Sequence, residues 1–71
     1  MQEVALREGE DFIKLGQMMK KAGIVSSGLD AKFLIQDGQV QVNGQVDSRR
    51  GRKLYEGDQV TFEGRTFVVV K

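Results

Sequence analysis

Residues 24–46 read IVSSGLDAKFLIQDGQVQVNGQV, and this stretch decides the fold. Ser27, followed three residues later by Asp30, matches the capping pattern Ser/Thr-x-x-Asp/Glu. In this pattern the hydroxyl and the carboxylate satisfy amides that would otherwise be unpaired at a helix start. The pattern predicts a helix over residues 28–37, which Gly38 ends in a left-handed conformation.

The apolar residues of this predicted helix share one face. Ala31, Leu34 and Ile35 form a stripe about 100° wide, which is typical of a helix packed on a core. Lys32 lies between the two faces, and Phe33 points away from the stripe. Phe33 could stack on a nucleobase, but we favour packing against a neighbouring element.

A hairpin follows the helix at once. Val40 and Val42 alternate with glutamines, and Asn43-Gly44 is a strong turn signal because both residues tolerate a positive φ angle. A strict two-residue turn would put Val46 on the face opposite Val42. The return strand is therefore expected to be bulged or very short.

Upstream, the pattern predicts a short strand over residues 2–6 and then a helix. Asp11 is expected to cap this helix, which runs to Ala22 and ends at Gly23. On a helical wheel an apolar and a polar face separate, although Ile13 interrupts the polar face. The core face would hold Phe12, Leu15, Met18, Met19 and Ala22, and the polar face Gly16, Gln17, Lys20 and Lys21.

Downstream, residues 47–58 show no apolar periodicity and are expected to form an exposed loop. Val60 and Phe62 predict a strand, Glu63-Gly64 a turn, and residues 66–70 a β-branched return strand. The expected order is β-α-α-β-β-β-β. It indicates an α+β fold in which two helices pack on one face of a small, mainly antiparallel sheet.

Length and composition bound the function. The 71 residues predict a single domain, residues 1–71, and contain no Cys and no His. The sequence therefore predicts no disulfide, no Cys/His zinc site, no cofactor and no catalytic centre of the usual kinds, so we expect no enzyme and no small-molecule substrate. No segment is typical of a signal peptide or a membrane span, which favours a cytoplasmic protein.

The net charge is only +1, but the basic residues are clustered. Residues 12–33 carry four lysines against one aspartate, and residues 47–54 carry three arginines and one lysine against one aspartate. Screening beyond roughly 8–10 Å lets such clusters present a positive face despite a nearly neutral total. Composition alone favours a merely solvated surface for such runs.

The spaced motifs resemble a known family. The run KLGQMMKKAGIVSSGLDAKFLIQDGQVQVNGQV is similar to the alpha-L RNA-binding motif, named after the fourth protein of the ribosomal small subunit, over roughly residues 12–63. The tail RRGRKLYEGDQVTF resembles the short stand-alone YaaA/YbcJ-like bacterial members. The residues that match the family pattern in order are Lys14, Leu15, Met19, Gly23, Ser26, Ser27, Ala31, Ile35, Gly38, Val40, Val42, Asn43 and Gly44.

Some positions depart from the family pattern. Gly16 stands where Asp is usual, Gly28-Leu29 replace a commonly basic pair, and Asp30 stands where Glu is usual. Losing the basic pair weakens the expectation of a phosphate contact at the start of the second helix. The basic residues 49–53 could compensate for that loss.

The resemblance and the charge pattern together imply binding of structured RNA, either ribosomal RNA or tRNA-like, with the ribosome as a candidate partner. A-form RNA is recognised largely through its phosphates and shape, which calls for cations and amide or hydroxyl donors. The predicted RNA-binding residues are Lys14, Lys20, Lys21, Ser26, Ser27, Lys32, Asn43, Arg49, Arg50, Arg52 and Lys53.

Several of these residues also have an ordinary structural role. Lys20 and Lys21 suit the last turn of a helix, Ser27 is first a cap, and Asn43 is first a turn former. The three arginines at 49, 50 and 52 are favoured as functional, because a folded domain has little use for so dense a cluster of cations. We expect their joint replacement by Ala to weaken RNA binding at least tenfold with little effect on folding.

Other functions remain as alternatives. A protein-interaction module or ribosome-assembly adaptor could use the same basic face against an acidic protein. A small sulfur carrier is rejected, because such proteins end in Gly-Gly and this chain ends in VVVK. The sequence shows no dimerisation seam, so a monomer is expected.

Overall fold

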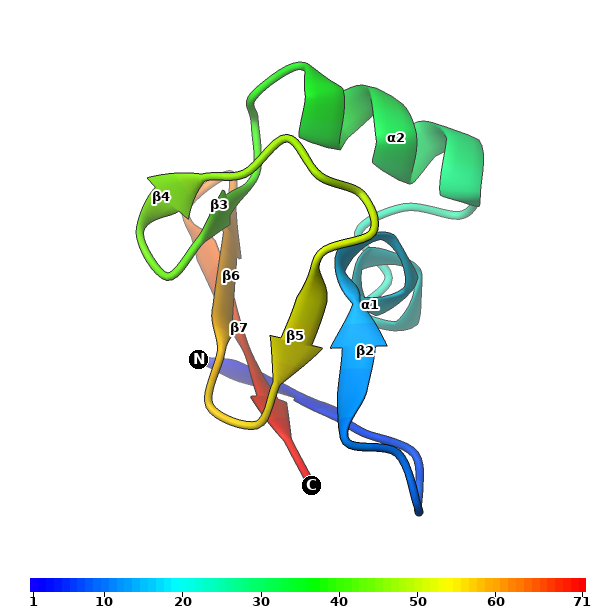
Figure 1. The fold of residues 1–71 in the computed structure, drawn as a ribbon. Helices are drawn as coiled ribbons and strands as arrows, with labels where there is room; N and C mark the ends of the chain where they lie inside the picture. Colours follow the sequence, from blue (N-terminus) through cyan, green and yellow to red (C-terminus); the bar gives the residue numbers. More distant parts are fainter.

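The computed structural model describes residues 1–71 as two helices and seven strands (Figure 1). The elements are, in chain order, β1 (Gln2–Ala5), β2 (Phe12–Lys14), α1 (Leu15–Lys21), α2 (Gly28–Gln36), β3 (Gln41–Val42), β4 (Gln45–Val46), β5 (Lys53–Tyr55), β6 (Gln59–Phe62) and β7 (Arg65–Val70). Neither helix has the length and apolar character needed to cross a membrane.

Five strands form the main sheet, in the order β1-β7-β6-β3-β4. β1 runs parallel to β7, and the other pairs are antiparallel. The expected α+β class and mainly antiparallel sheet are confirmed. A second sheet, formed by β2 and β5 alone, was not predicted.

The first helix begins later than predicted. Phe12–Lys14 forms β2, and α1 begins at Leu15, so the prediction that Asp11 caps this helix is wrong. The residue at the cap position is Lys14, whose side chain makes no capping hydrogen bond. Main-chain carbonyls replace the cap: the N–H of Leu15 donates to Arg52 O at 2.8 Å, and the N–H of Gly16 donates to Arg50 O at 3.0 Å.

The segment expected to be an exposed loop contains β5. Lys53, Leu54 and Tyr55 alternate exposed, buried and exposed, and Leu54 is fully buried. Three residues are too few to show a period in the sequence, and the strand forms because β2 supplies its hydrogen-bonding partner.

The second helix agrees with its sequence signals. Ser27 Oγ accepts a hydrogen bond from the Asp30 N–H at 3.2 Å, and Gly38 has φ +76° after the helix ends. The Asp30 carboxylate departs from the expected capping role, because it accepts a hydrogen bond from Ser26 Oγ at 3.3 Å.

Both predicted hairpin turns are present. Asn43 and Gly44 have φ angles of 52° and 85°, which suit a two-residue turn between antiparallel strands. The return strand β4 has only two residues and is therefore very short, one of the two expected outcomes, and its Val46 pairs with Gln41. Val46 is 59% exposed, as a strict turn requires.

Thirteen buried apolar side chains make one core between the helices and the main sheet. They are Val4, Leu6, Leu15, Met18, Met19, Ala31, Ile35, Val40, Val42, Leu54, Val60, Phe67 and Val69. Gly16, expected on the polar face of its helix, is buried. Phe33 points away from the core stripe as predicted, but it stays 59% exposed where packing against another element was expected.

Candidate nucleic-acid interface

The starts of the two helices meet the segment between β4 and β5 at a shallow hollow of about 320 Å³. We call this hollow the basic depression. Its lining contains three cations and no acidic residue, and consists of Lys14, Gly16, Gln17, Lys20, Gly28, Arg50 and Gly51. Gly28 and Gly51 have open space where a Cβ would lie, so an incoming backbone can approach their peptide groups closely, whereas the Arg50 side chain covers Gly16.

Arg50 reaches this position because its segment crosses the start of α1 (Figure 1). Its carbonyl accepts from the Gly16 N–H, and its side-chain stem lies directly over Gly16. A Cβ added at Gly16 would lie 2.8 Å from Arg50 Cγ, too close for ordinary contact. Glycine at this position, where the family usually has Asp, therefore makes room for the arginine.

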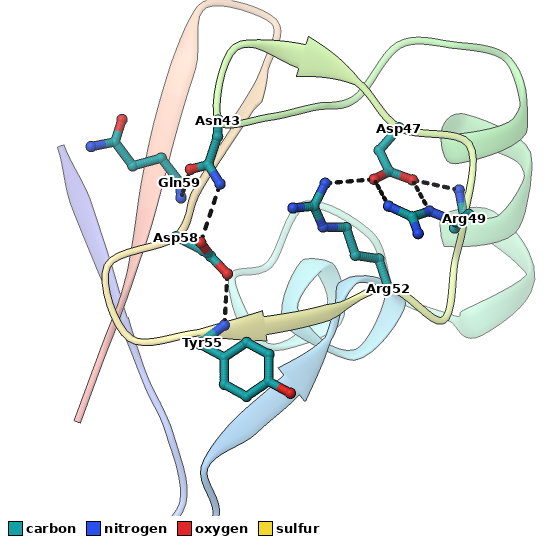
Figure 2. A network of polar contacts seen from close by, with 7 residues as sticks. All are labelled: Asn43, Asp47, Arg49, Arg52, Tyr55, Asp58 and Gln59. Atoms are coloured by element: carbon teal, nitrogen blue, oxygen red, sulfur yellow. Dashed lines mark hydrogen bonds and ion pairs between the residues drawn. The ribbon is translucent and has the colours of Figure 1, made fainter.

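Asp47 holds the same segment from its other side (Figure 2). Its carboxylate receives two side-chain hydrogen bonds from Arg49, at 3.1 and 2.9 Å, and one from Arg52 at 2.7 Å. The backbone N–H of Arg49 also donates to it at 2.9 Å. The Asp47 side chain is only 6% exposed, and the pairing holds its pKa well below the usual range, chiefly through the hydrogen bond from Arg49.

These ion pairs change the interpretation of the arginine cluster. Arg49 and Arg52 have a structural partner in Asp47, whereas we expected a folded domain to have little use for so dense a cluster of cations. Replacing all three arginines would leave a buried carboxylate unpaired and would affect folding. Arg50 stands apart, because its side chain enters no ion pair or hydrogen bond and lines the basic depression.

The remaining cations divide between two neighbouring areas. Lys14 lies directly opposite Lys53 across the β2–β5 pair, and Lys14 also lines the basic depression. Lys20 borders both this depression and a second hollow beside Lys21. Lys21 Nζ donates a hydrogen bond to the carbonyl of Ala5, so this lysine also fastens α1 to the end of β1.

The predicted contacts at α2 do not enter the basic depression. Ser27 is engaged as the helix cap, Ser26 donates to Asp30, and Lys32 is half-buried on the helix. Only Gly28 lines the depression from this helix. The Asp30 carboxylate in the first turn lowers the positive potential there.

Asn43 lies elsewhere and has structural partners. Its side-chain amide donates to Asp58 Oδ1 at 3.1 Å, and its side-chain oxygen accepts from the Gln59 N–H at 2.9 Å (Figure 2). Asp58 Oδ2 in turn accepts from the Tyr55 N–H at 2.7 Å. The residue therefore joins the β3–β4 turn to the β5–β6 turn, and an RNA contact at Asn43 stays a prediction.

Sequence reasoning missed four lining residues: Gly16, Gln17, Gly28 and Gly51. The departures from the family pattern at Gly16 and Gly28 could have indicated this site, because both glycines line the basic depression. Gly51, between Arg50 and Arg52, carried no signal that could be distinguished from an ordinary loop glycine.

Comparison with known proteins identifies relatives of the whole architecture. A family model described as "S4 domain" matches residues 4–70. "Probable ribosome maturation protein RlbA" of Bacillus subtilis (strain 168) is 48% identical over 54 residues, which cover 76% of this chain and 76% of that protein. "Putative RNA-binding protein YbcJ" of Escherichia coli (strain K12) is 38% identical over 58 residues, 82% of this chain and 83% of that protein.

One solved structure extends the similarity to three dimensions. The solution structure of YbcJ from E. coli, described as revealing an alpha-L motif involved in RNA-binding, has a TM-score of 0.72 to this chain. Sequence identity in that superposition is 34%, and it covers 100% of this chain and 89% of that one.

Proposed function

This chain belongs to the S4 domain family, and from that premise we propose that residues 1–71 act as a single, non-enzymatic RNA-binding domain. The proposed target is structured RNA, either ribosomal RNA or tRNA-like. Such a target implies a cytoplasmic protein, which we propose acts as a monomer.

The basic depression is the observation that carries this proposal. Lys14, Lys20 and Arg50 come from three segments and surround glycine backbone without an opposing carboxylate. An A-form helix offers phosphates and 2′-hydroxyls on a regular surface, while its deep major groove hides the base edges. A shallow, basic, glycine-lined hollow suits that surface better than it suits a small ligand.

A second function is favoured by one observation. The B. subtilis relative carries the name of a probable ribosome maturation protein, which suits an adaptor that acts during ribosome assembly. An adaptor could use the same cations against an acidic protein, with a similar salt dependence. Competition by ribosomal RNA or tRNA fragments would distinguish the two, because only RNA recognition predicts strong competition.

The first experiment is a salt series of binding to a structured ribosomal RNA fragment, with single-stranded RNA and duplex DNA of equal length as competitors. If about five cations neutralise phosphates, the logarithm of the binding constant should fall against the logarithm of salt with a slope of roughly −3.5 to −4.5. Equal binding of all three nucleic acids, or no binding, would contradict the proposal.

A pair of charge-matched variants tests the surface itself. Lys20→Gln/Arg50→Gln removes two cations from the basic depression, whereas Arg65→Gln/Lys71→Gln removes one arginine and one lysine that do not line it. We expect the first variant to weaken binding about tenfold or more and to reduce the salt slope by about 1 to 2. The control should change either quantity little, and equal losses in both variants would place binding elsewhere.

A further inference from the structure

The two-stranded sheet has an outer face of unusual composition. Side chains directly opposite in an antiparallel pair share a face, and successive residues alternate between faces. Phe12 pairs with Tyr55 and Lys14 with Lys53 on the outside, while Ile13 and the buried Leu54 face the core. We call the four outer residues the aromatic–lysine face; they comprise two aromatics, two cations and no acid.

The two aromatic residues lie next to each other, and Tyr55 is the more exposed of the two. Their centroids are 5.9 Å apart with an angle of 51° between the planes, and Tyr55 is 50% exposed. Lys53 Nζ lies 4.8 Å from the centre of the Phe12 ring, close enough for a cation–π interaction. Figure 2 shows the Tyr55 ring extending from β5, whose backbone Asp58 fixes at that point.

The two lysines indicate that a ligand of this face carries negative charge. Like charges directly opposite on adjacent strands destabilise a sheet, and Lys14 and Lys53 occupy such a pair. A phosphate between them would accept hydrogen bonds from both ammonium groups and relieve their mutual repulsion. Lys14 also lines the basic depression, so the aromatic–lysine face continues the surface proposed above for RNA.

We propose that the aromatic–lysine face binds one unpaired nucleotide of the target RNA. Its base stacks on Tyr55, next to Phe12, and its phosphate lies between Lys14 and Lys53. Only an unpaired base has a free ring face to offer, because bases within a duplex already stack on one another. The subsite rests on the proposed function and specifies it: the target is a structured RNA with an unpaired nucleotide beside its helix.

Three RNA ligands separate stacking from phosphate contact: a blunt duplex, the same duplex with adenosine overhangs, and the same duplex with abasic overhangs. The abasic overhang keeps the phosphates and removes only the bases. We expect the adenosine overhang to raise affinity about five- to hundredfold over the abasic one. Equal affinity for the two overhangs would overturn the proposal.

Two substitutions at one position provide the protein-side test. Tyr55→Thr removes the ring and introduces a β-branched residue, which suits a strand, whereas Tyr55→Phe keeps the ring. We expect Tyr55→Thr to abolish the preference for adenosine over abasic overhangs, and Tyr55→Phe to retain it within about twofold. An unchanged preference in Tyr55→Thr would exclude the ring from the site.

The unmodified protein offers an independent readout, which does not depend on the folding of a variant. Tyr55 is the single tyrosine, and the chain has no tryptophan, so its emission reports this position alone. The adenosine overhang should quench that emission, and the abasic overhang should not, after correction with free tyrosine amide. Equal quenching by both would contradict stacking. Absence of binding to all three duplexes would overturn the subsite, while binding to the ribosomal fragment would still support the proposed function.

Discussion

Asp47 gives two of the neighbouring arginines, Arg49 and Arg52, a structural role. It is the only polar or charged residue other than glycine among the buried residues, at 7% exposure. Burial of a carboxylate is unfavourable unless it is paired, and Arg49 and Arg52 provide the pairing. Two of the three clustered arginines are therefore part of the fold, and Arg50 is left as the one that faces the basic depression.

We expect Asp47→Asn to lower the free energy of unfolding by about 1–2 kcal/mol, because it removes charged hydrogen bonds within a partly exposed network. Arg49 is 70% exposed, so solvent screening keeps the loss moderate. Urea denaturation at neutral pH would measure the difference. The exposed Asp11, replaced in Asp11→Asn, is the matched control and should change stability little.

The same carboxylate should make stability depend on pH on the acid side. The arginines hold the pKa of Asp47 below its unfolded value of about 4, so its contribution is full above that pH and declines as pH falls toward the lowered pKa. Asp47→Asn should lose less stability than the wild type between neutral pH and acid. Parallel pH profiles would contradict this assignment.

At the scale of an element, the start of α1 depends on a distant segment. Leu15 and Gly16 donate to carbonyls of Arg52 and Arg50, and Gly16 also leaves room for the Arg50 side chain. A helix start is usually stabilised by a local side chain, such as the predicted Asp11. Here the stabilising groups lie far along the chain, so the capping rule failed at α1 and succeeded at α2.

The contact between Gly16 and Arg50 predicts coupling between the two positions. Gly16→Ala alone should change the free energy of unfolding little. Helix propensity favours alanine by about 0.5–1 kcal/mol, but the new Cβ must displace the Arg50 side chain, which opposes this gain. In an Arg50→Ala background the Arg50 Cγ is absent, so Gly16→Ala should raise the free energy of unfolding by about 0.5–1 kcal/mol. Urea denaturation of the four proteins would measure the coupling.

Gly28→Ala is the control for this cycle, because a Cβ there meets nothing within 4 Å. Its effect on stability should be the same in the wild-type protein and in the Arg50→Ala background. Additive effects of Gly16→Ala and Arg50→Ala would show that the close approach has no energetic consequence.

At the scale of the whole molecule, the small β2–β5 sheet joins the segments that we propose face RNA to the core. Leu54 is fully buried and pairs with Ile13, although the sequence predicted an exposed loop over residues 47–58. The sheet therefore fixes the outer residues Lys14, Lys53 and Tyr55 relative to the helices. A surface assembled from segments so far apart keeps its shape only while this sheet is docked.

Leu54→Ala should accordingly destabilise the domain by about 2–4 kcal/mol through lost burial and a cavity. Val46→Ala, at an apolar strand position that is 59% exposed, should change stability by less than about 0.5 kcal/mol. Urea denaturation would compare the two. Similar, small effects in both variants would mean that the second sheet contributes little to the core.

The sequence by itself determined the elements whose signals are local. The capped helix α2, the turns at Asn43-Gly44 and Glu63-Gly64, and most of the core positions follow from contacts within a few residues or from positive φ angles. The resemblance of the spaced motifs correctly indicated the family.

Only the tertiary structure decided the rest. The strands β2 and β5 have three residues each, too few for a detectable period, and they form because each is the other's hydrogen-bonding partner. The burial of Gly16, the pairing of two arginines with Asp47 and the gathering of Lys14, Lys20 and Arg50 depend on the same long-range approach. A local pattern specifies a helix or a turn, whereas the surface where distant residues meet is specified by packing of the whole chain.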